Sequence, residues 1–191
     1  MTDTRPAVAS DADAIARVHV ESWQEAYRDL LPSDFLAGLS VESRTARWVA
    51  NLTEVTATRT RVALVDGEVC GFASVGPCRD PDLHGAGAWE VYALYLSPGV
   101  LGRGIGRDLM AAALGDVPPE ATTVTLWVLA GNVRARSFYE AAGFVADGRR
   151  QDIAIGGVTL TEVRYVQPAR ARPRARRTGR RWSRGPGRAP G

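Results

Sequence analysis

The stretch GVLGRGIGRDLM, residues 99–110, places glycines at positions 102, 104 and 106 directly before helix-forming sequence. Glycine loses more backbone entropy on folding than other residues, so this density indicates a special loop conformation or a close approach to a ligand. A strand, a glycine loop and a helix N-terminus in succession present backbone N–H groups that suit a phosphate. The spacing excludes two common nucleotide motifs: GxGxxG would need glycine at Arg107, and GxxxxGK[ST] is absent. The loop alone therefore predicts an anion site and leaves the ligand open.

The segments on either side of this loop alternate between strand and helix. Residues 88–97, AWEVYALYLS, are rich in aromatic and branched side chains and predict a buried strand, and a helix follows over 104–115. Residues 122–130, TTVTLWVLA, predict a second central strand. Asn132 is expected to cap the helix after it, with Gly143 just past the helix end.

The remaining sequence predicts helices first and hairpins later. Ser10, with Asp13 as capping-box partner, is expected to begin the first helix. Turns at Asp66-Gly67 and Gly156-Gly157 predict two hairpins. We therefore expect one α+β domain with a mostly antiparallel sheet of about seven strands and about four helices. The further segments are a strand at 4–8, helices at 33–38 and 41–52, and hairpins at 60–76 and 144–166.

Charge divides the chain into two parts. Residues 168–191 carry nine arginines and no acid, whereas residues 1–167 carry 15 basic and 21 acidic side chains. We expect residues 1–167 to form the folded domain and residues 168–191 to be a disordered tail rich in Arg, Pro and Gly, because the tail has almost no apolar surface to bury. The tail is a solvated extension, a nonspecific contact for nucleic acid or other acidic surfaces, or a segment that folds back weakly on the acidic domain.

Several classes of protein are excluded by composition. No apolar run approaches the length that spans a bilayer, and the N-terminus lacks the order of a signal peptide, so we expect a cytoplasmic protein without a membrane partner. Cys70 and Cys78 are too few for a disulfide framework and lack CxxC spacing. No metal site is expected.

Two motifs around the loop narrow its ligand. YLSPGVLGRGIGRDLM, preceded by a strand that carries an acid, and NVRARSFYEAAGF resemble the GCN5-related N-acetyltransferases, the GNAT superfamily, over residues 4–166. The family's R/Q-x-x-G-x-G/A signature and its Asn-to-Tyr-to-Gly-Phe element occur here in order, with a strand between them. Leu101 stands where Arg or Gln is usual, which removes one side-chain contact but leaves the backbone N–H groups. The matching positions are Leu101, Gly104, Gly106, Asn132, Tyr139, Gly143 and Phe144.

The resemblance implies a sheet splayed at an acetyl-coenzyme A (acetyl-CoA) site, with acetyl-CoA as cosubstrate. The backbone of Leu94, Tyr95 and Leu96 would pair with the pantetheine arm, and an N–H there would polarise the thioester carbonyl. Asn132 either bonds the cofactor arm or caps its helix, and both roles can coexist. The pyrophosphate would bind the backbone of the glycine loop, with charge added by its arginines: Gly102, Arg103, Gly104, Ile105, Gly106 and Arg107.

The same resemblance implies the chemistry. Tyr139 matches the family tyrosine that protonates the departing sulfur. Glu90, an acid in an apolar strand, is a base or water-positioning residue, an electrostatic anchor, or half of a structural pair. Trp23 and Tyr27 are expected either to line the acceptor pocket or to pack in the core. His19, one turn earlier, is expected either to line that pocket or to be a packed histidine on the helix face. His84 is expected to be solvated.

These inferences lead to one function and one alternative from another class. The expected function is transfer of an acetyl group from acetyl-CoA to a primary amine by direct attack in a ternary complex. The acceptor is a small molecule or a peptide amine. The alternative is a noncatalytic acyl-CoA-binding regulatory module whose basic tail contacts nucleic acid. Similar enzymes are often homodimers, and the sequence leaves the oligomeric state open.

Overall fold

The structure is a computed structural model that describes residues 3–83 and 85–168. His84 and the expected tail beyond Pro168 lie outside these residues. The seven strands are β1 (Asp3–Pro6), β2 (Arg59–Val65), β3 (Glu68–Pro77), β4 (Trp89–Leu96), β5 (Thr123–Leu129), β6 (Val145–Ile155) and β7 (Val158–Pro168). The helices are α1 (Ala12–Ala26), the short α2 (Ser33–Ala37), α3 (Val41–Thr53), α4 (Ile105–Gly115) and α5 (Val133–Ala141), with 3-10 turns η1 (Ala9–Asp11), η2 (Pro81–Leu83) and η3 (Pro98–Val100).

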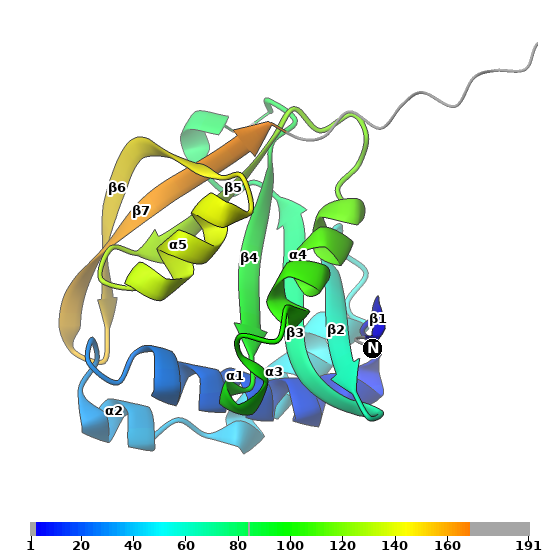
Figure 1. Cartoon of the computed structure of the whole chain (residues 1–191), viewed down its shortest axis with the longest axis vertical. Helices are drawn as coiled ribbons and strands as arrows, with labels where there is room; N and C mark the ends of the chain where they lie inside the picture. Colours follow the sequence, from blue (N-terminus) through cyan, green and yellow to red (C-terminus); the bar gives the residue numbers. More distant parts are fainter. Residues whose placement is uncertain (1–2, 84, 169–191) are drawn as a thin grey trace, which may run out of the picture.

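All seven strands form one sheet in the order β1-β2-β3-β4-β5-β7-β6 (Figure 1). Neighbouring strands are antiparallel except β4 and β5, which are parallel. The expected α+β fold with a mostly antiparallel seven-stranded sheet is thereby confirmed. No helix among the described residues is long and apolar enough to cross a membrane.

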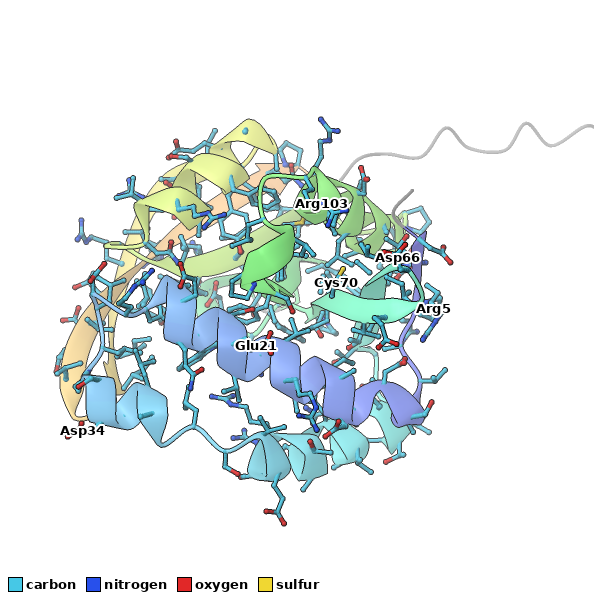
Figure 2. The ribbon with its side chains drawn as sticks, turned by 60° about the horizontal axis from the view of Figure 1, so that its bottom comes forward. Arg5, Glu21, Asp34, Asp66, Cys70 and Arg103 are labelled. Atoms are coloured by element: carbon cyan, nitrogen blue, oxygen red, sulfur yellow. The ribbon has the colours of Figure 1, made fainter. Side chains whose placement is uncertain are left out.

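Helices cover both faces of the sheet because side chains alternate along each strand. Val62 and Phe72 pack with α1 and α3, while their neighbours Ala63 and Ala73 pack on the opposite face with α4 and α5. Figure 2 shows α1 lying across the molecule, with Glu21 on α1 and Asp34 on α2. The sheet is therefore the middle layer, and the first helices form a layer separate from α4 and α5.

The hairpin turns are set locally and match the expectation. Asp66 and Gly67 both have positive φ, 54° and 86°, and they join Val65 directly to its partner Glu68. Gly156 and Gly157 repeat this geometry, with φ of 59° and 80°, between β6 and β7. Two consecutive positive φ angles match the right-handed twist of paired strands, which explains why glycine or aspartate occupies these positions.

The start of the first helix differs from the expectation of a Ser10–Asp13 capping box. The helix begins at Ala12, after η1, and Ser10 does not cap it. The carboxylate of Asp11 instead accepts the backbone N–H of Val8 at 2.8 Å and is held by Arg5 at 2.7 Å. Asp13 pairs with Arg17 one turn later. Charge-assisted hydrogen bonds are stronger than neutral ones, so the buried Asp11 carboxylate, and not the Ser10 hydroxyl, holds the backbone before this helix.

The sheet opens in its centre, between β4 and β5. The two strands pair only at Trp89 with Val124 and at Glu90 with Thr125. A bulge in β4 lies at Tyr92, where the register with β3 shifts. Bulges bend the strand that carries them and increase its local twist. Beyond Glu90, β4 therefore continues along β3 while β5 continues along β7, and a gap opens between them.

Candidate functional site

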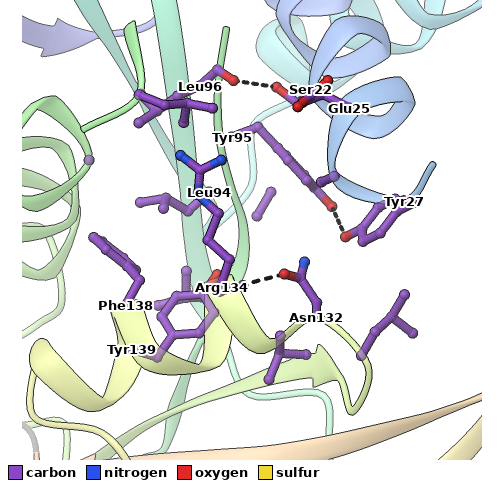
Figure 3. Close-up of a pocket in the computed structure, with 18 of the residues that line it drawn as sticks. Ser22, Glu25, Tyr27, Leu94, Tyr95, Leu96, Asn132, Arg134, Phe138 and Tyr139 are labelled. Atoms are coloured by element: carbon purple, nitrogen blue, oxygen red, sulfur yellow. Dashed lines mark hydrogen bonds between the residues drawn. The ribbon is translucent and has the colours of Figure 1, made fainter. Parts of the chain in front are cut away.

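A cavity of about 610 Å³ lies where β4 and β5 diverge. Its wall comes from α1, residues 91–96 of β4, the glycine loop, residues 127–129 of β5, α5 and one residue of β7 (Figure 3). Most residues that the sequence singled out meet here although they are far apart in the chain. Those in the wall are Tyr27, Leu94, Tyr95, Leu96, Gly102, Gly104, Gly106, Arg107, Asn132 and Tyr139; Trp23, Glu90, Arg103 and Ile105 are not.

The glycine loop forms one part of this wall. Gly102 and Gly104 have φ of 78° and 85°, in the left-handed region that other residues avoid. Gly106 instead allows close packing, since a Cβ there would lie 3.1 Å from Cδ1 of Leu96. The N–H groups of residues 102–106 donate to no group in the described part of the chain, and the last two begin α4. Consecutive free N–H groups at a helix N-terminus favour an anion such as pyrophosphate.

Two arginines add positive charge to the cavity. Arg107 on α4 and Arg134 on α5 both line it, and neither forms an ion pair within residues 3–83 and 85–168. Figure 3 shows Arg134 reaching from α5 toward Leu94. Arg103 lies on the loop (Figure 2) but outside the wall. Of the two arginines expected at the loop, the wall thus contains Arg107 but not Arg103, and it also contains Arg134, which the sequence reasoning did not single out.

Beyond Glu90, the edge of β4 that faces the cavity pairs with no strand in residues 3–83 and 85–168. Residues 94–96 pair with β3 on their other edge only. One group of the free edge is already occupied, because the Ser22 hydroxyl donates to the carbonyl oxygen of Leu96 at 2.7 Å. The rest can pair with an extended ligand as an added strand would.

Three tyrosines cluster at the cavity. The hydroxyls of Tyr27 and Tyr95 lie 3.4 Å apart, and both residues interact electrostatically with Tyr139. Tyr139 is 8% exposed, and burial raises the pKa of its hydroxyl above the usual value. That hydroxyl bonds to no described residue and is not sealed from solvent. It is therefore a protonated donor that is free to bond a ligand.

The sequence model of the acetyltransferase (GNAT) family matches residues 16–144. The chain belongs to the GNAT family. It is thus an N-acetyltransferase of a family that uses acetyl-CoA and acetylates amines, which agrees with a cavity that joins free N–H groups to a free strand edge.

Relatives of this GNAT protein cover most of its length. It is 31% identical over 166 residues to YuaI, an uncharacterised N-acetyltransferase of Bacillus subtilis, across 85% of this chain and 91% of that one. An N-acetyltransferase from Staphylococcus aureus matches with a TM-score of 0.69 and 16% identity, over 89% of this chain and 99% of that chain. The PaiA N-acetyltransferase of Thermoplasma acidophilum, solved in complex with coenzyme A, matches with a TM-score of 0.63 and 21% identity, over 85% and 98%. Both structural matches show a shared fold.

Glu90 of this GNAT protein lies outside the cavity wall. Its side chain is 3% exposed, and its carboxylate accepts hydrogen bonds from the backbone N–H and from two guanidinium nitrogens of Arg79. Of the roles that the sequence left open, the structure displays the ion pair. Asn132 likewise shows one of its two roles, since its Oδ1 accepts the N–H of Ala135 and caps α5.

Trp23 and His19 lie outside the cavity wall, whereas Tyr27 forms part of it. Trp23 packs edge-on against Tyr27, and its buried indole N–H lies near the Tyr95 hydroxyl without forming a hydrogen bond of good geometry to any described residue. His19 stacks on Tyr95 with ring centroids 5.1 Å apart. Burial, with smaller contributions from the positive charges of Arg44 and Arg47, lowers the pKa of His19 to about 3. His19 is thus a neutral packed side chain, which is one of the two roles expected for it.

Sequence reasoning missed several wall residues, and three of them matter for the chemistry of the cavity: Trp127 on β5, Arg134 on α5 and Glu162 on β7. Arg134 lies two residues after the helix cap Asn132, within the family motif, and this position is the one local signal for a charge at the cavity. Glu162 lacks any local signal, because an acid in an alternating strand ordinarily marks the solvent face. No cluster of three or more His, Cys, Asp or Glu side chains that could hold a metal ion occurs in the described part of the chain.

Proposed function

We propose that this protein transfers the acetyl group of acetyl-CoA to a primary amine by direct attack within a ternary complex. The observation that carries the proposal is one continuous cavity, with free N–H groups in the glycine loop and with tyrosines and a carboxylate also in its wall. Such a cavity can hold a cofactor and an acceptor together. The coenzyme A complex of the Thermoplasma relative supports the cofactor part of the proposal.

The binding roles follow from the groups that are free. The N–H groups of residues 102–106 hold the pyrophosphate, and Arg107 and Arg134 neutralise phosphate charge. The free edge of residues 94–96 pairs with the pantetheine arm, and a backbone N–H there polarises the thioester carbonyl. Leu101 supplies no charge, which leaves this task to backbone groups and the two arginines.

Direct attack is supported by the nucleophiles present. Both cysteines are buried and lie outside the cavity wall, and burial raises the pKa of each thiol. Ser22 lines the cavity, but its hydroxyl donates to Leu96. An acyl-enzyme would need an activated nucleophile in the wall, and neither residue type provides one among the described residues.

The proton balance of the transfer assigns Tyr139 as general acid. The acceptor, an ammonium ion in solution, loses one proton to solvent water and attacks as the free amine. The C–N bond forms while the C–S bond breaks, and the nitrogen, positively charged once it is bonded to the acyl carbon, releases a second proton to solvent water. The thiolate sulfur takes the Tyr139 proton, and solvent restores the phenol. Burial favours the protonated phenol, so Tyr139 carries the required proton at neutral pH. We assign Glu90 to the ion pair with Arg79, which holds the start of β4 against the segment after β3.

Steady-state kinetics test the proposal. Coenzyme A release is followed with a thiol reagent while acetyl-CoA and a panel of amines, including peptide N-termini and peptide lysines, are varied. Intersecting lines in double-reciprocal plots are expected; parallel lines with a burst of coenzyme A in the absence of amine would contradict direct attack. The chain contains no lysine. A labelled acetyl group found on the protein itself would therefore not come from acetylation of one of its own lysine side chains. Tight acetyl-CoA binding without turnover of any amine would favour the noncatalytic alternative.

A further inference from the structure

Glu162 brings a negative charge to the cavity that no cation within the described residues neutralises. It lies on β7 opposite Leu129 of β5, and both residues line the cavity. Its Oε2 accepts one hydrogen bond, from the side-chain amide of Gln151 at 2.8 Å. The other acid in the wall, Glu25, pairs with Arg28. In contrast to Glu25, the carboxylate of Glu162 has only a neutral partner.

The neighbours of Glu162 are tyrosines that also surround Tyr139. Burial raises the pKa of Tyr27 and of Tyr95, and the negative charge of Glu162 adds to the rise in both cases. Tyr27 and Tyr95 also interact electrostatically with Tyr139. Glu162 lines the same cavity as these three tyrosines, so the unpaired carboxylate belongs to the same group of side chains as the proposed general acid and lies near the proposed site of transfer.

The wall near this carboxylate is aromatic and apolar. Trp127, Tyr27 and Tyr95 line the cavity together with Leu129. The orientation of Trp127 is fixed by two residues outside the cavity wall. Its indole N–H donates to Asp80 at 2.9 Å, and the Arg164 guanidinium lies 5.7 Å from its ring centroid. Aromatic faces attract cations and pack apolar groups, and a fixed ring does so without loss of side-chain entropy.

We propose that Glu162 binds the ammonium group of the acceptor, and that the acceptor is a cationic amine with an aromatic or aliphatic body. The proposal rests on the transferase function proposed above and names its substrate class. An unpaired carboxylate attracts an ammonium ion, whereas the carboxylate of an α-amino acid would be repelled by it at the same place. Glu162 is a specificity-determining residue in this assignment, and the loss of the acceptor proton does not depend on it.

Three matched pairs of acceptors test the proposal in the full chain: 2-phenylethylamine with phenylalanine, tryptamine with tryptophan, and isopentylamine with leucine. Each pair differs only in the α-carboxylate. In the wild type, kcat/KM for the amine is expected to exceed that of the amino acid by at least roughly tenfold in one pair or more. Glu162→Gln is expected to raise the KM of the preferred amine about tenfold to hundredfold, to leave the KM of acetyl-CoA unchanged, and to narrow the discrimination against the amino acid.

Asp152→Asn is the matched control. Asp152 pairs with Thr161, so it lies on the same hairpin but on the face opposite to Glu162, and its loss removes the same charge. Its KM for the amine is expected to equal that of the wild type. An unchanged amine KM in Glu162→Gln, or no preference for the amine in any pair, would overturn the proposal.

Equilibrium binding separates this inference from the transferase function. If none of the amines is acetylated, calorimetric binding of the three amines to the protein with coenzyme A present still tests Glu162. Tighter binding to the wild type than to Glu162→Gln would then support the ammonium site and contradict only the transferase function. Equal or absent binding would contradict the ammonium site.

Discussion

The carboxylate of Glu90 is held by Arg79 through three hydrogen bonds, one from its backbone N–H and two from its guanidinium group, the shortest 2.5 Å long. Glu90 is buried, whereas the side chain of Arg79 is 66% exposed. The buried negative charge of Glu90 is thus paired with a guanidinium group that remains in contact with solvent. It ties the residue at which the short β4–β5 pairing ends to the segment that follows β3.

Glu90→Gln is therefore expected to reduce stability rather than remove a base. The loss of a charge-assisted bond costs about 1–2 kcal/mol, which lowers Tm by roughly 2–8 °C in a chain of this size. Arg79→Gln should cause a similar loss, and in both variants kcat should fall by the same modest factor. Glu42→Gln, at an exposed position that forms no ion pair with any described residue, is the control. A large loss of kcat in Glu90→Gln at unchanged Tm, with Arg79→Gln active, would instead identify Glu90 as the base.

Tyr139→Phe is expected to lower kcat by about a hundredfold, within the range that general acid catalysis contributes, while the KM of acetyl-CoA changes little. The reason is that only the proton donor is removed and the ring remains packed. Because burial raises its pKa, Tyr139 stays protonated, so the wild-type kcat should show no alkaline loss from this group below its usual pKa near 10. Tyr165→Phe serves as control, because Tyr165 is buried in the core and its hydroxyl donates to the exposed Glu140, so its loss should affect Tm more than kcat.

Gly104→Ala is expected to weaken acetyl-CoA binding by roughly five- to thirtyfold, measured by calorimetry. An alanine held in the left-handed region costs about 1–2 kcal/mol of conformational free energy. The variant loop is expected to avoid this cost by adopting another conformation, in which its N–H groups no longer point toward the pyrophosphate. The added methyl group would not clash with a neighbour, because the nearest atom to a Cβ built at this position is Nη2 of Arg107 at 3.7 Å. Gly148 has nearly the same φ, 87° against 85°, in β6 away from the cavity. Gly148→Ala should lose similar stability and bind acetyl-CoA normally; equal weakening in both variants would contradict the assignment.

His19 is expected to make the protein less stable as the pH falls from about 6.5 toward about 3. The pKa of His19 is lowered to about 3 by burial and then by nearby arginines, while the unfolded chain keeps the ordinary value of 6.5. Between these values only the unfolded state binds the proton, so the stabilising contribution is complete above pH 6.5 and decreases below it. Urea unfolding of wild type and His19→Phe between pH 7 and pH 4 checks this. The slope of the unfolding free energy against pH should be shallower in the variant, and equal slopes would refute it.

The sequence determined the features of this protein that depend on neighbouring residues. Asp66-Gly67 and Gly156-Gly157 set two hairpin turns through positive φ angles, and Asn132 caps α5 through a bond to the third residue after it. These interactions are local, so their energies can be inferred from residue type and spacing. The glycine loop and the Asn132–Tyr139 element identified the family for the same reason, because each motif lies within one short segment.

The tertiary structure alone decided which side chains meet. The bulge at Tyr92 and the parallel placement of β4 beside β5 open the sheet, and that gap gathers Tyr27, Trp127, Tyr139 and Glu162 from four separate elements. In the assembled sheet the Glu90 side chain also contacts Arg79 and lies outside the cavity wall. Such choices depend on which face each strand presents after the sheet assembles, and one sequence pattern of alternation fits either face. The motifs therefore determine where the cofactor is expected to bind, while the acceptor side of the cavity results from long-range packing.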